Sequence, residues 1–325
     1  LRQKPVLLII LFVILVILII PFKKTAKKTT DNLPEIHLQA LNPNLKPEAT
    51  FDQIILQQPT KQIVVYQISA PTQNQLTNLF EPLGREFNFS ASPENIIINN
   101  LPHLFWNNRP NFLTVNLQSG SFTLDYHPKT ASSSAKLAEI DTINIAKNWL
   151  LQYQLIFEDV KSQSSIIEDK IGDSYPNTST PSFQIYFYPT LNNLPIFTPN
   201  SVDAPISIII TPSGNISSIY YRLPTTLFTN LKSLKTNNRS ILSSTQIEQA
   251  IQGKKPVITR LTFSNGNFAS STSNLKTVNY NQITLGYSNE LANNQLPPVF
   301  QLTGTGTLDT GETVTVTAYL PALAD

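Results

Sequence analysis

The residues that could support acid–base or metal chemistry are few and lie far apart in this sequence. The three histidines are His37, His103 and His127, and the closest group of ligand-type residues is Asp125-Tyr126-His127. Side chains two residues apart on a strand point to the same face, so Asp125 and His127 could act together, but a metal site needs a third ligand. We therefore predict a solvent-facing strand end here and no bound metal or other cofactor.

Serine and carboxylate chemistry has no better support. The Ser-Gly pairs at 119–120 and 213–214 do not form a Gly-x-Ser-x-Gly elbow between a strand and a helix, which predicts hairpin turns. Glu168 and Asp169 could serve as an acid and a base, but their polar surroundings are typical of a solvated loop. The run TGTGT at 303–307 precedes a strand, which favours a bulge or tight strand connection over a phosphate site. These patterns predict that the protein is not an enzyme.

Aromatic residues are better candidates for a binding surface. Tyr186 and Tyr188 flank Phe187, and alternation along a strand places the two tyrosines on one face and Phe187 on the other. Together with Tyr220 and Tyr221 they could form a contact patch for a peptide or a glycan. The loop-like segment LPHLFWNNRP adds Trp106 to this candidate interaction surface. The alternative is that these rings belong to the core or are ordinary half-exposed tyrosines.

Three similar units are predicted to position these residues. Each has a short amphipathic helix followed by an apolar hairpin that turns on a small residue and a glycine. In the first unit, apolar residues recur at helical spacing from Leu76 through Phe80 to Leu83, and Gly84 ends the stripe. Its hairpin, FLTVNLQSGSFTLDYH, alternates apolar and polar residues on both arms and turns at 119–120.

The second and third units follow the same plan. The helix N-cap is predicted at residues 141–142 in the second unit and at 243–244 in the third, where Gly253 ends the helix. The hairpins of these units turn at 213–214 and 310–311. Small helix-plus-sheet units in series predict an α+β fold with antiparallel sheets and more strand than helix.

Composition restricts the classes of function. Charged residues make up 14% of the chain and the formal net charge is +2. Much of this excess lies beside the N-terminal apolar run, so no basic face remains to bind nucleic acid. The chain has no cysteine, which excludes disulfides, thiolate metal sites and cysteine nucleophiles. We expect a nearly neutral globular part without a nucleic-acid partner.

The apolar run from Val6 to Ile20 predicts a membrane helix. Its fifteen uninterrupted apolar residues make about 22 Å of helix, which is shorter than the roughly 30 Å hydrocarbon core. Lysines follow the run and no small-residue cleavage pattern stands at the right distance. We therefore predict an uncleaved signal anchor over residues 1–22 that enters the bilayer through residues 6–22, with a cleaved signal sequence as the alternative. Its expected contacts are Val6, Leu11, Phe12, Ile20, Lys23 and Lys24.

The orientation of the chain rests on two opposing observations. Four lysines follow the apolar run and two basic residues precede it, so the positive-inside rule taken literally places the globular part in the cytoplasm. Residues 23–55 are rich in proline and polar residues, and they predict an extended stalk of the kind used on the outer face. We expect a single-pass cell-membrane protein whose globular part, 56–130, 137–235 and 236–325, lies on the extracytoplasmic side.

The C-terminal part of the chain resembles a known family. Four segments carry the resemblance, in this order: FYPTLNNLPIF, ISIIITPSGNISSIYY, ILSSTQIEQAIQGKKPVI and ITLGYSNELANNQLPPVFQLTGTGTLDTGETVTVTAYLPAL. From about residue 137 to the end, their pattern is similar to that of the YycH/YycI-type regulatory proteins and the wider PepSY-like domain group. The resemblance implies a membrane-tethered, extracytoplasmic, non-enzymatic module that binds another protein, which in the best-known relatives is a sensor histidine kinase.

These observations favour a regulatory or protein-interaction module of the bacterial cell envelope that modulates a membrane sensor or another envelope protein. One alternative is a structural cell-surface or secretion-associated subunit that uses the apolar helix for assembly. A further alternative is an envelope hydrolase, which the scattered titratable residues disfavour.

Overall fold

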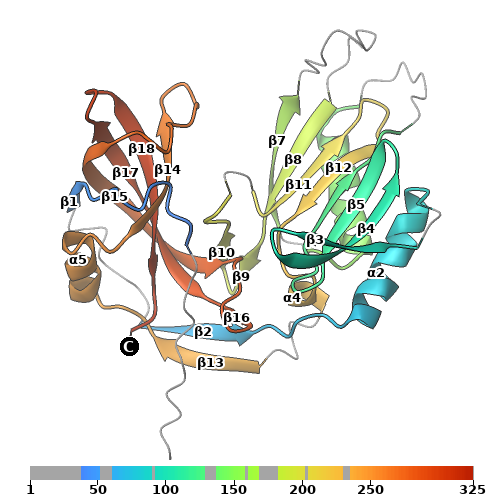
Figure 1. The fold of residues 1–325 in the computed structure, drawn as a ribbon, viewed down its shortest axis with the longest axis horizontal. Coiled ribbons are helices and arrows are strands. Elements are labelled where there is room, and N and C mark those ends of the chain that lie inside the picture. Colours follow the sequence, from blue (N-terminus) through green and yellow to red (C-terminus); the bar gives the residue numbers. More distant parts are fainter. Residues whose placement is uncertain are drawn as a thin grey trace, which may run out of the picture. The chain divides into compact units, whose positions relative to one another are not determined.

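The computed structural model is described over eight stretches of the chain (Figure 1). These stretches are residues 38–51, 61–89, 92–128, 137–157, 160–167, 182–201, 204–229 and 235–324. Outside them lie the expected membrane residues Val6, Leu11, Phe12, Ile20, Lys23 and Lys24, together with His37, Glu168 and Asp169. Across the described stretches, no helix combines the length and the apolar character needed to span a bilayer. The described residues are mostly β, with three sheets and a few short helices, and this confirms the predicted excess of strand over helix.

The largest sheet has eight strands, and all neighbours in it are antiparallel. In sheet order these strands are β3 (Glu94–Ile98), β4 (Leu101–Asn108), β5 (Asn111–Asn116), β6 (Phe122–Asp125), β12 (Ile216–Tyr221), β11 (Ile206–Ile210), β8 (Ser182–Tyr188) and β7 (Lys161–Ile167). Alternation of side chains gives the sheet one apolar face, on which Phe183, Ile185 and Phe187 of β8 are all buried.

Helices α2 (Gln73–Glu86) and α3 (Glu139–Gln152) cover this apolar face. Phe80 of α2 meets the ring of Phe122 edge to face, with ring centroids 5.1 Å apart, and α3 packs on β7, β8 and β11. Both helices are amphipathic, and burying their apolar stripes against the sheet supplies most of the stability that short helices lack by themselves. The sheet therefore has one covered face and one face that these two helices do not cover.

The second sheet has seven strands and is mixed. Its strands are β14 (Val257–Phe263), β18 (Thr313–Pro321), β17 (Pro298–Leu308), β15 (Leu275–Ser288), β10 (Leu194–Phe197) and β9 (Thr190–Leu191), with β1 (Glu48–Phe51) also paired to β15. The pairs β1–β15 and β10–β15 are parallel and the others are antiparallel. Helix α5 (Ser244–Gln252) contacts β1.

A third sheet has three antiparallel strands, β13 (Lys235–Ser240), β2 (Gln62–Gln67) and β16 (Gln295–Leu296), and a short helix α4 (Thr226–Thr229) precedes β13. The hydroxyl group of Tyr287 in β15 donates a hydrogen bond to the carbonyl oxygen of Val64 in β2 at 2.8 Å. The rings of Tyr66 and Tyr287 meet edge to face with centroids 5.7 Å apart. These contacts fasten β2 to the seven-stranded sheet.

The sheets cross the unit boundaries that the sequence predicts. Leu124 of β6 stands opposite Ile219 of β12, so strands from 56–130 and 137–235 share the eight-stranded sheet. Strand β10 pairs with β15 of the last unit, and β1, from the expected stalk at 23–55, pairs with β15 as well. A hairpin by itself is marginally stable, and each hairpin here gains stability by joining strands from distant parts of the chain.

The helix ends agree with the sequence in part. Helix α5 begins after Ser243, whose hydroxyl accepts from the backbone N–H of Gln246 at 3.3 Å, and it ends at Gly253, as predicted. Helix α3 begins three residues earlier than predicted, with Ala138 as its N-cap. The Thr142 hydroxyl donates to the carbonyl oxygen of Glu139 at 2.6 Å, so this side chain lies inside the first turn and does not cap it.

The predicted turns and the glycine-rich run are both explained by backbone geometry. Gly120, Gly214 and Gly311 have φ values of 75°, 83° and 87°, which confirms the three predicted hairpin turns. In the run TGTGT, a Cβ on Gly304 would lie 2.2 Å from the Asn279 carbonyl oxygen of β15. The register between β15 and β17 shifts by one residue beside this point, which confirms the predicted bulge. The run lies inside β17, so it is not a connection between two strands. Asparagine pairs with positive φ form three turns that were not predicted, at 99–100, 192–193 and 293–294.

Candidate functional site

The predicted tyrosines lie on the face of the eight-stranded sheet opposite α2 and α3, which we call the open face. Tyr186 of β8 and Tyr220 of β12 both stand opposite Ser207 of β11, and Tyr220 also stands opposite Thr123 of β6. Residues directly opposite one another share a sheet face. The register therefore brings Tyr186 and Tyr220 into one row, although they lie far apart along the chain.

The alternation predicted for β8 is confirmed. Phe187 is fully buried under α3, whereas Tyr188 is 40% exposed and Tyr186 is half-buried on the open face. The open face continues beyond the tyrosines with half-buried Phe105 and Phe112 on β4 and β5. Rings that are part exposed and part buried are held in place while still offering contact area to a partner.

Trp106 does not belong to this surface. Its side chain is 4% exposed, and a Cβ on Gly84 of α2 would lie 3.7 Å from the indole Nε1. Residues 101–108 of the segment LPHLFWNNRP form strand β4 and not a loop, and alternation places Trp106 with buried Leu104 on the covered face. Phe105, one residue earlier, occupies the position on the open face that was expected for Trp106.

An arginine fixes the position of Tyr220. The guanidinium carbon of Arg222 lies 5.2 Å from the centroid of the Tyr220 ring. Arg222 also donates from Nη1 to the carbonyl oxygen of Ala204 at 3.1 Å, and its own carbonyl oxygen accepts from Asn289 Nδ2 at 2.9 Å. A cation held over the ring by other contacts limits the motion of the ring.

A cleft of about 840 Å³ adjoins Tyr220 at this end of the open face. One wall is formed by strands β4, β5, β6 and β12, and the others by the segment after β10 and by the connection between β15 and β16. Its polar lining includes His103, Thr114, Asn116, Thr123, Asn200, Ser201, Arg222, Asn289, Glu290, Asn293 and Asn294. Amides and hydroxyls can both donate and accept hydrogen bonds, so this cleft suits a polar ligand of low net charge.

Among the described lining residues of this cleft, Glu290 carries the carboxylate. Burial raises the pKa of its carboxyl group above the ordinary value, and a hydrogen bond with Asn200 opposes part of this rise. The backbone N–H of Glu290 donates to Ser288 Oγ at 3.1 Å. The carboxyl group is thus held at the cleft wall in surroundings that weaken its ionisation.

His103 is the histidine of the cleft, and its neighbours hold its ring. Nδ1 lies 2.9 Å from the Leu101 carbonyl oxygen and must carry the hydrogen there, while Nε2 lies 3.5 Å from Asn116 Nδ2. Asp125 and His127 do not line the cleft. Within the described stretches, no three His, Asp or Glu side chains come close enough together to hold a metal ion.

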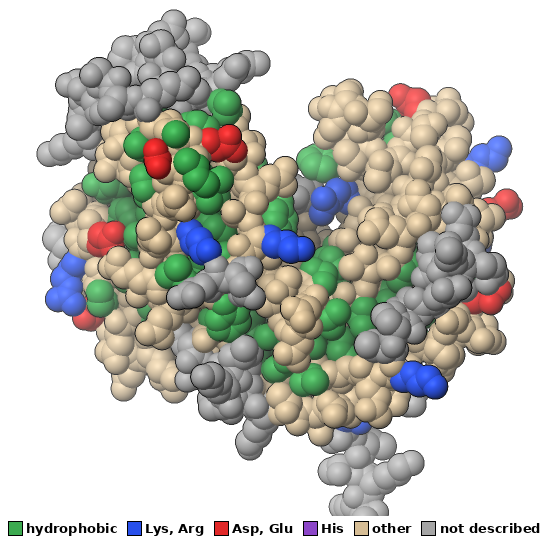
Figure 2. Space-filling view, turned by 180° about the vertical axis from the view of Figure 1, so that it is seen from behind, with side chains coloured by type: hydrophobic (Ala, Val, Ile, Leu, Met, Phe, Trp, Pro, Cys, Tyr) green, Lys and Arg blue, Asp and Glu red, His purple; other side chains and the backbone are tan. Residues whose placement is uncertain are grey.

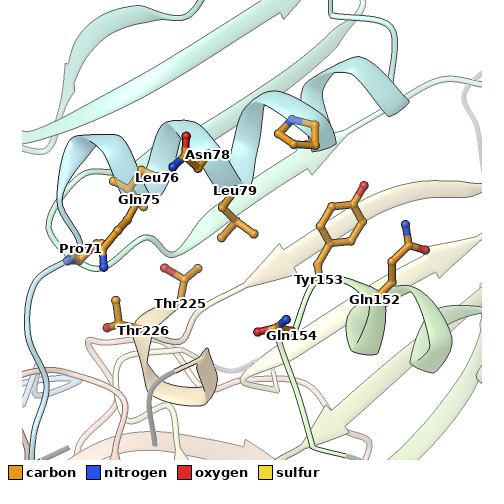
Figure 3. A pocket seen from close by; sticks show the side chains of 11 residues that line it. Pro71, Gln75, Leu76, Asn78, Leu79, Gln152, Tyr153, Gln154, Thr225 and Thr226 are labelled. Atoms are coloured by element: carbon orange, nitrogen blue, oxygen red, sulfur yellow. The ribbon is translucent and has the colours of Figure 1, made fainter. Parts of the chain in front are cut away.

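A second groove, of about 400 Å³, lies on the helix side of the sheet. Figure 3 shows Leu79 of α2 between Thr225 and Tyr153, which stands at the end of α3, with Gln75 nearer to Thr225 and Thr226. The Tyr153 hydroxyl donates to Glu86 Oε2, and burial together with Glu86 raises the pKa of this phenol. Among the described lining residues, Tyr153 is the one with an ionisable side chain, and it is already bonded. The cleft on the open face is therefore the better candidate site.

The sequence did not predict that His103, Arg222 and Glu290 line the same cleft. They come from β4, the end of β12 and the connection after β15, and only the sheet topology brings them to one cleft. The sequence offers one weak signal, the polar stretch SNELANN between two apolar strands. Such a stretch indicates a loop but does not indicate which strands it will meet.

Comparisons with known proteins give little further information. No family model matches the sequence, and no curated protein matches it. The structure is similar to the crystal structure of an uncharacterized protein from Eubacterium rectale, with 13% sequence identity and a TM-score of 0.47. The aligned region covers 80% of this chain and 82% of that chain. Similarity at this level says nothing about the function of this chain.

Proposed function

We propose that this chain is a membrane-anchored, extracytoplasmic, non-enzymatic module that binds another protein of the membrane or envelope and regulates it. The observation that carries the proposal is the row of half-exposed aromatic side chains on the open face, with Tyr188 40% exposed. The anchor predicted at residues 6–22 and the resemblance to YycH/YycI-type proteins and PepSY-like units agree with this function.

The chemistry of the open face suits a protein partner. Tyrosines enrich binding surfaces because each buries a large apolar ring, loses little conformational entropy and keeps a hydroxyl group for a hydrogen bond. Tyr186, Tyr188 and Tyr220 project from a sheet whose other face is fixed by a packed core. A rigid platform lowers the entropy that binding must overcome.

The surface also indicates how the partner is recognised. Figure 2 shows charged side chains scattered singly over the face seen from behind, with uncharged polar and backbone atoms over most of it. Charged residues are 14% of the sequence, so steering by a strong field contributes little. The partner segment is accordingly polar and nearly neutral, with its aromatic contacts on Tyr186 and Tyr188 and its hydrogen bonds in the cleft beside Tyr220.

Site-specific photo-crosslinking in intact cells tests the function. A benzophenone amino acid at position 188 should crosslink to one membrane or envelope protein, and an added Tyr220→Ala substitution should reduce the yield at least fivefold. Phe268, which is 54% exposed and lies outside the eight-stranded sheet, provides the matched control position. Equal crosslinking from 188 and 268, or a yield at 188 that Tyr220→Ala leaves unchanged, would contradict the proposal.

Removing residues 1–28 tests the expected role of the membrane segment. The truncated protein should crosslink less to the same partner, because anchoring raises the local concentration of the module near a membrane protein. Protease added outside intact cells should digest the globular part of the full chain. Digestion only after the cells are opened would place the module in the cytoplasm and overturn the proposed location.

A further inference from the structure

We propose that strand β3 pairs edge to edge with β3 of a second copy of this chain, so that two eight-stranded sheets join across a two-fold axis. Among the strands that the structure describes, β3 is the first of its sheet and has β4 as its one neighbour (Figure 1). This contact uses the sheet edge, not the open face, and does not depend on the proposed function.

The hairpin geometry determines which backbone groups of β3 point outward. Asn99 and Asn100 have φ values of 50° and 64° and form a two-residue turn, with Ile98 opposite Leu101. In such a turn the two flanking residues, here Ile98 and Leu101, exchange backbone hydrogen bonds with each other. Along the two strands, hydrogen-bonded pairs then alternate with non-hydrogen-bonded pairs.

Pro102, opposite Ile97, provides an independent check of this alternation. Proline has no N–H, so Ile97 and Pro102 must form a non-hydrogen-bonded pair, as the alternation requires. The backbone N–H and C=O groups of Asn95 and Ile97 therefore point away from β4. They face the free edge as a ready template for another strand.

Several other edges of the described sheets carry devices that hinder pairing. Strand β13 carries Arg239 on the edge of its sheet, and β14 carries Arg260 and a bulge. Strands β9 and β16 have two residues each. Charges, bulges and short length are the usual devices that keep edges from pairing. Strand β7, at the far edge of the eight-stranded sheet, resembles β3 in carrying a charge only at its first residue, Lys161.

Strand β3 has none of these devices at its centre. Its sequence is ENIII, with a charge only at its first residue, and Ile97 is 70% exposed and Ile98 37% exposed. An edge strand with no charge at its centre and with consecutive exposed isoleucines is suited to pairing, because burying these side chains adds to the new backbone hydrogen bonds.

A second copy fits this edge because β3 is complementary to itself. Antiparallel pairing centred on Ile96 places Asn95 of each copy opposite Ile97 of the other, so the two outward pairs exchange four backbone hydrogen bonds. Glu94 of each copy then stands opposite Ile98 of the other. No like charges face each other, and Ile96 meets its own counterpart in a non-hydrogen-bonded pair.

This register predicts which residue of β3 can form a disulfide with its counterpart in the second copy. The chain contains no cysteine, so a single introduced cysteine can test it. In a non-hydrogen-bonded pair the two Cα atoms lie about 4.5 Å apart, which is within the range of a disulfide. Oxidation of full-length Ile96→Cys should therefore give a covalent dimer. Full-length Ile98→Cys is the control, because its two sulfurs would be separated by four residue steps, roughly 13 Å, and should give at least tenfold less dimer.

A charge substitution tests the same edge without cysteine. Ile97→Lys should weaken self-association of the full chain in detergent at least tenfold, measured by light scattering over a concentration series. Ile166→Lys is the matched control, since Ile166 is 62% exposed on β7 at the other edge of the same sheet. Ile97→Pro, which removes an outward N–H and keeps every bond to β4, should act like Ile97→Lys. Circular dichroism verifies that each variant is folded.

Two results would overturn the proposal. One is a covalent dimer yield for Ile96→Cys no higher than that for Ile98→Cys. The other is equal self-association of folded Ile97→Lys and Ile166→Lys. A loss of partner crosslinking with the β3 dimer intact would instead contradict the proposed function alone, so the two failures can be told apart.

Discussion

The guanidinium group of Arg222 lies over the ring of Tyr220, with its carbon 5.2 Å from the ring centroid. Tyr220 belongs both to the aromatic row of the open face and to the wall of the cleft. Arg222 also bonds to Ala204 in the segment that precedes β11. One side chain therefore links the Tyr220 ring, the cleft and the segment before β11.

Replacing Arg222 by alanine should lower both stability and binding. The loss of the cation–π contact and of the hydrogen bond to Ala204 should reduce the free energy of unfolding by about 1–2 kcal/mol, measured by urea denaturation at neutral pH. Lys276→Ala is the control, because Lys276 is exposed on β15 and its removal should change stability by less than about 0.5 kcal/mol. A loss equal to that of the control would show that Arg222 does not hold Tyr220 in place.

Local features of the fold could be predicted because they depend on a few neighbouring residues. The capping of α5 needs only Ser243 and Gln246, and the turn at Gly214 needs only a residue that tolerates positive φ. The two faces of β8 follow from alternation alone, so Tyr186 and Tyr188 could be separated from Phe187 before the structure was known.

Features that depend on distant pairing could not be predicted. Leu124 and Ile219 are paired in the eight-stranded sheet, but nothing in either hairpin specifies the other as its partner. The pairing of strands across the predicted unit boundaries and the cleft of His103 and Glu290 were both missed for this reason. Trp106 was misassigned because its proline- and asparagine-rich surroundings resemble a loop, whereas pairing with β5 makes them a strand.

Substituting glutamine for Glu290 should change how stability depends on pH. Burial raises the pKa of this carboxyl group above its ordinary value of 4.5, so the folded chain holds the proton more tightly than the unfolded chain does. The contribution of Glu290 to stability is then greatest below that value and declines as the pH rises through the raised pKa.

The comparison of wild type with Glu290→Gln isolates this effect. Urea midpoints measured from about pH 4 to about pH 7 should fall for the wild type relative to the variant, because the glutamine cannot ionise. Parallel pH profiles for the two proteins would show that the carboxyl group is not desolvated at the cleft wall.

Adding a methyl group at Gly304 should destabilise the seven-stranded sheet. A Cβ at this position would lie 2.2 Å from the Asn279 carbonyl oxygen, so β15 and β17 would have to separate. Overpacking of this kind costs about 1–3 kcal/mol or more. Gly84→Ala is the control: its Cβ would meet Trp106 at 3.7 Å, an ordinary contact, and alanine favours a helix, so stability should rise by about 0.5–1 kcal/mol. Thermal and urea unfolding should show a lower stability for Gly304→Ala and a higher stability for Gly84→Ala than for the wild type. Equal changes in stability for the two variants would contradict the close approach of β17 to β15.

Removing the Tyr221 hydroxyl should weaken the attachment of the chain after α3 to the eight-stranded sheet. This hydroxyl group is buried and donates to the Leu155 carbonyl oxygen at 3.1 Å. Tyr221→Phe leaves that oxygen without its donor, and the expected loss in the free energy of unfolding is about 1–2 kcal/mol. Tyr188→Phe removes a hydroxyl from a ring that is 40% exposed, so its free energy of unfolding should match that of the wild type.

Burial also raises the pKa of the Tyr221 phenol, so the folded chain keeps its proton more tightly than the unfolded chain. Stability should therefore decline in strongly alkaline solution for the wild type and less for Tyr221→Phe. Equal losses for the two tyrosine variants would show that water replaces the bond to Leu155 without cost.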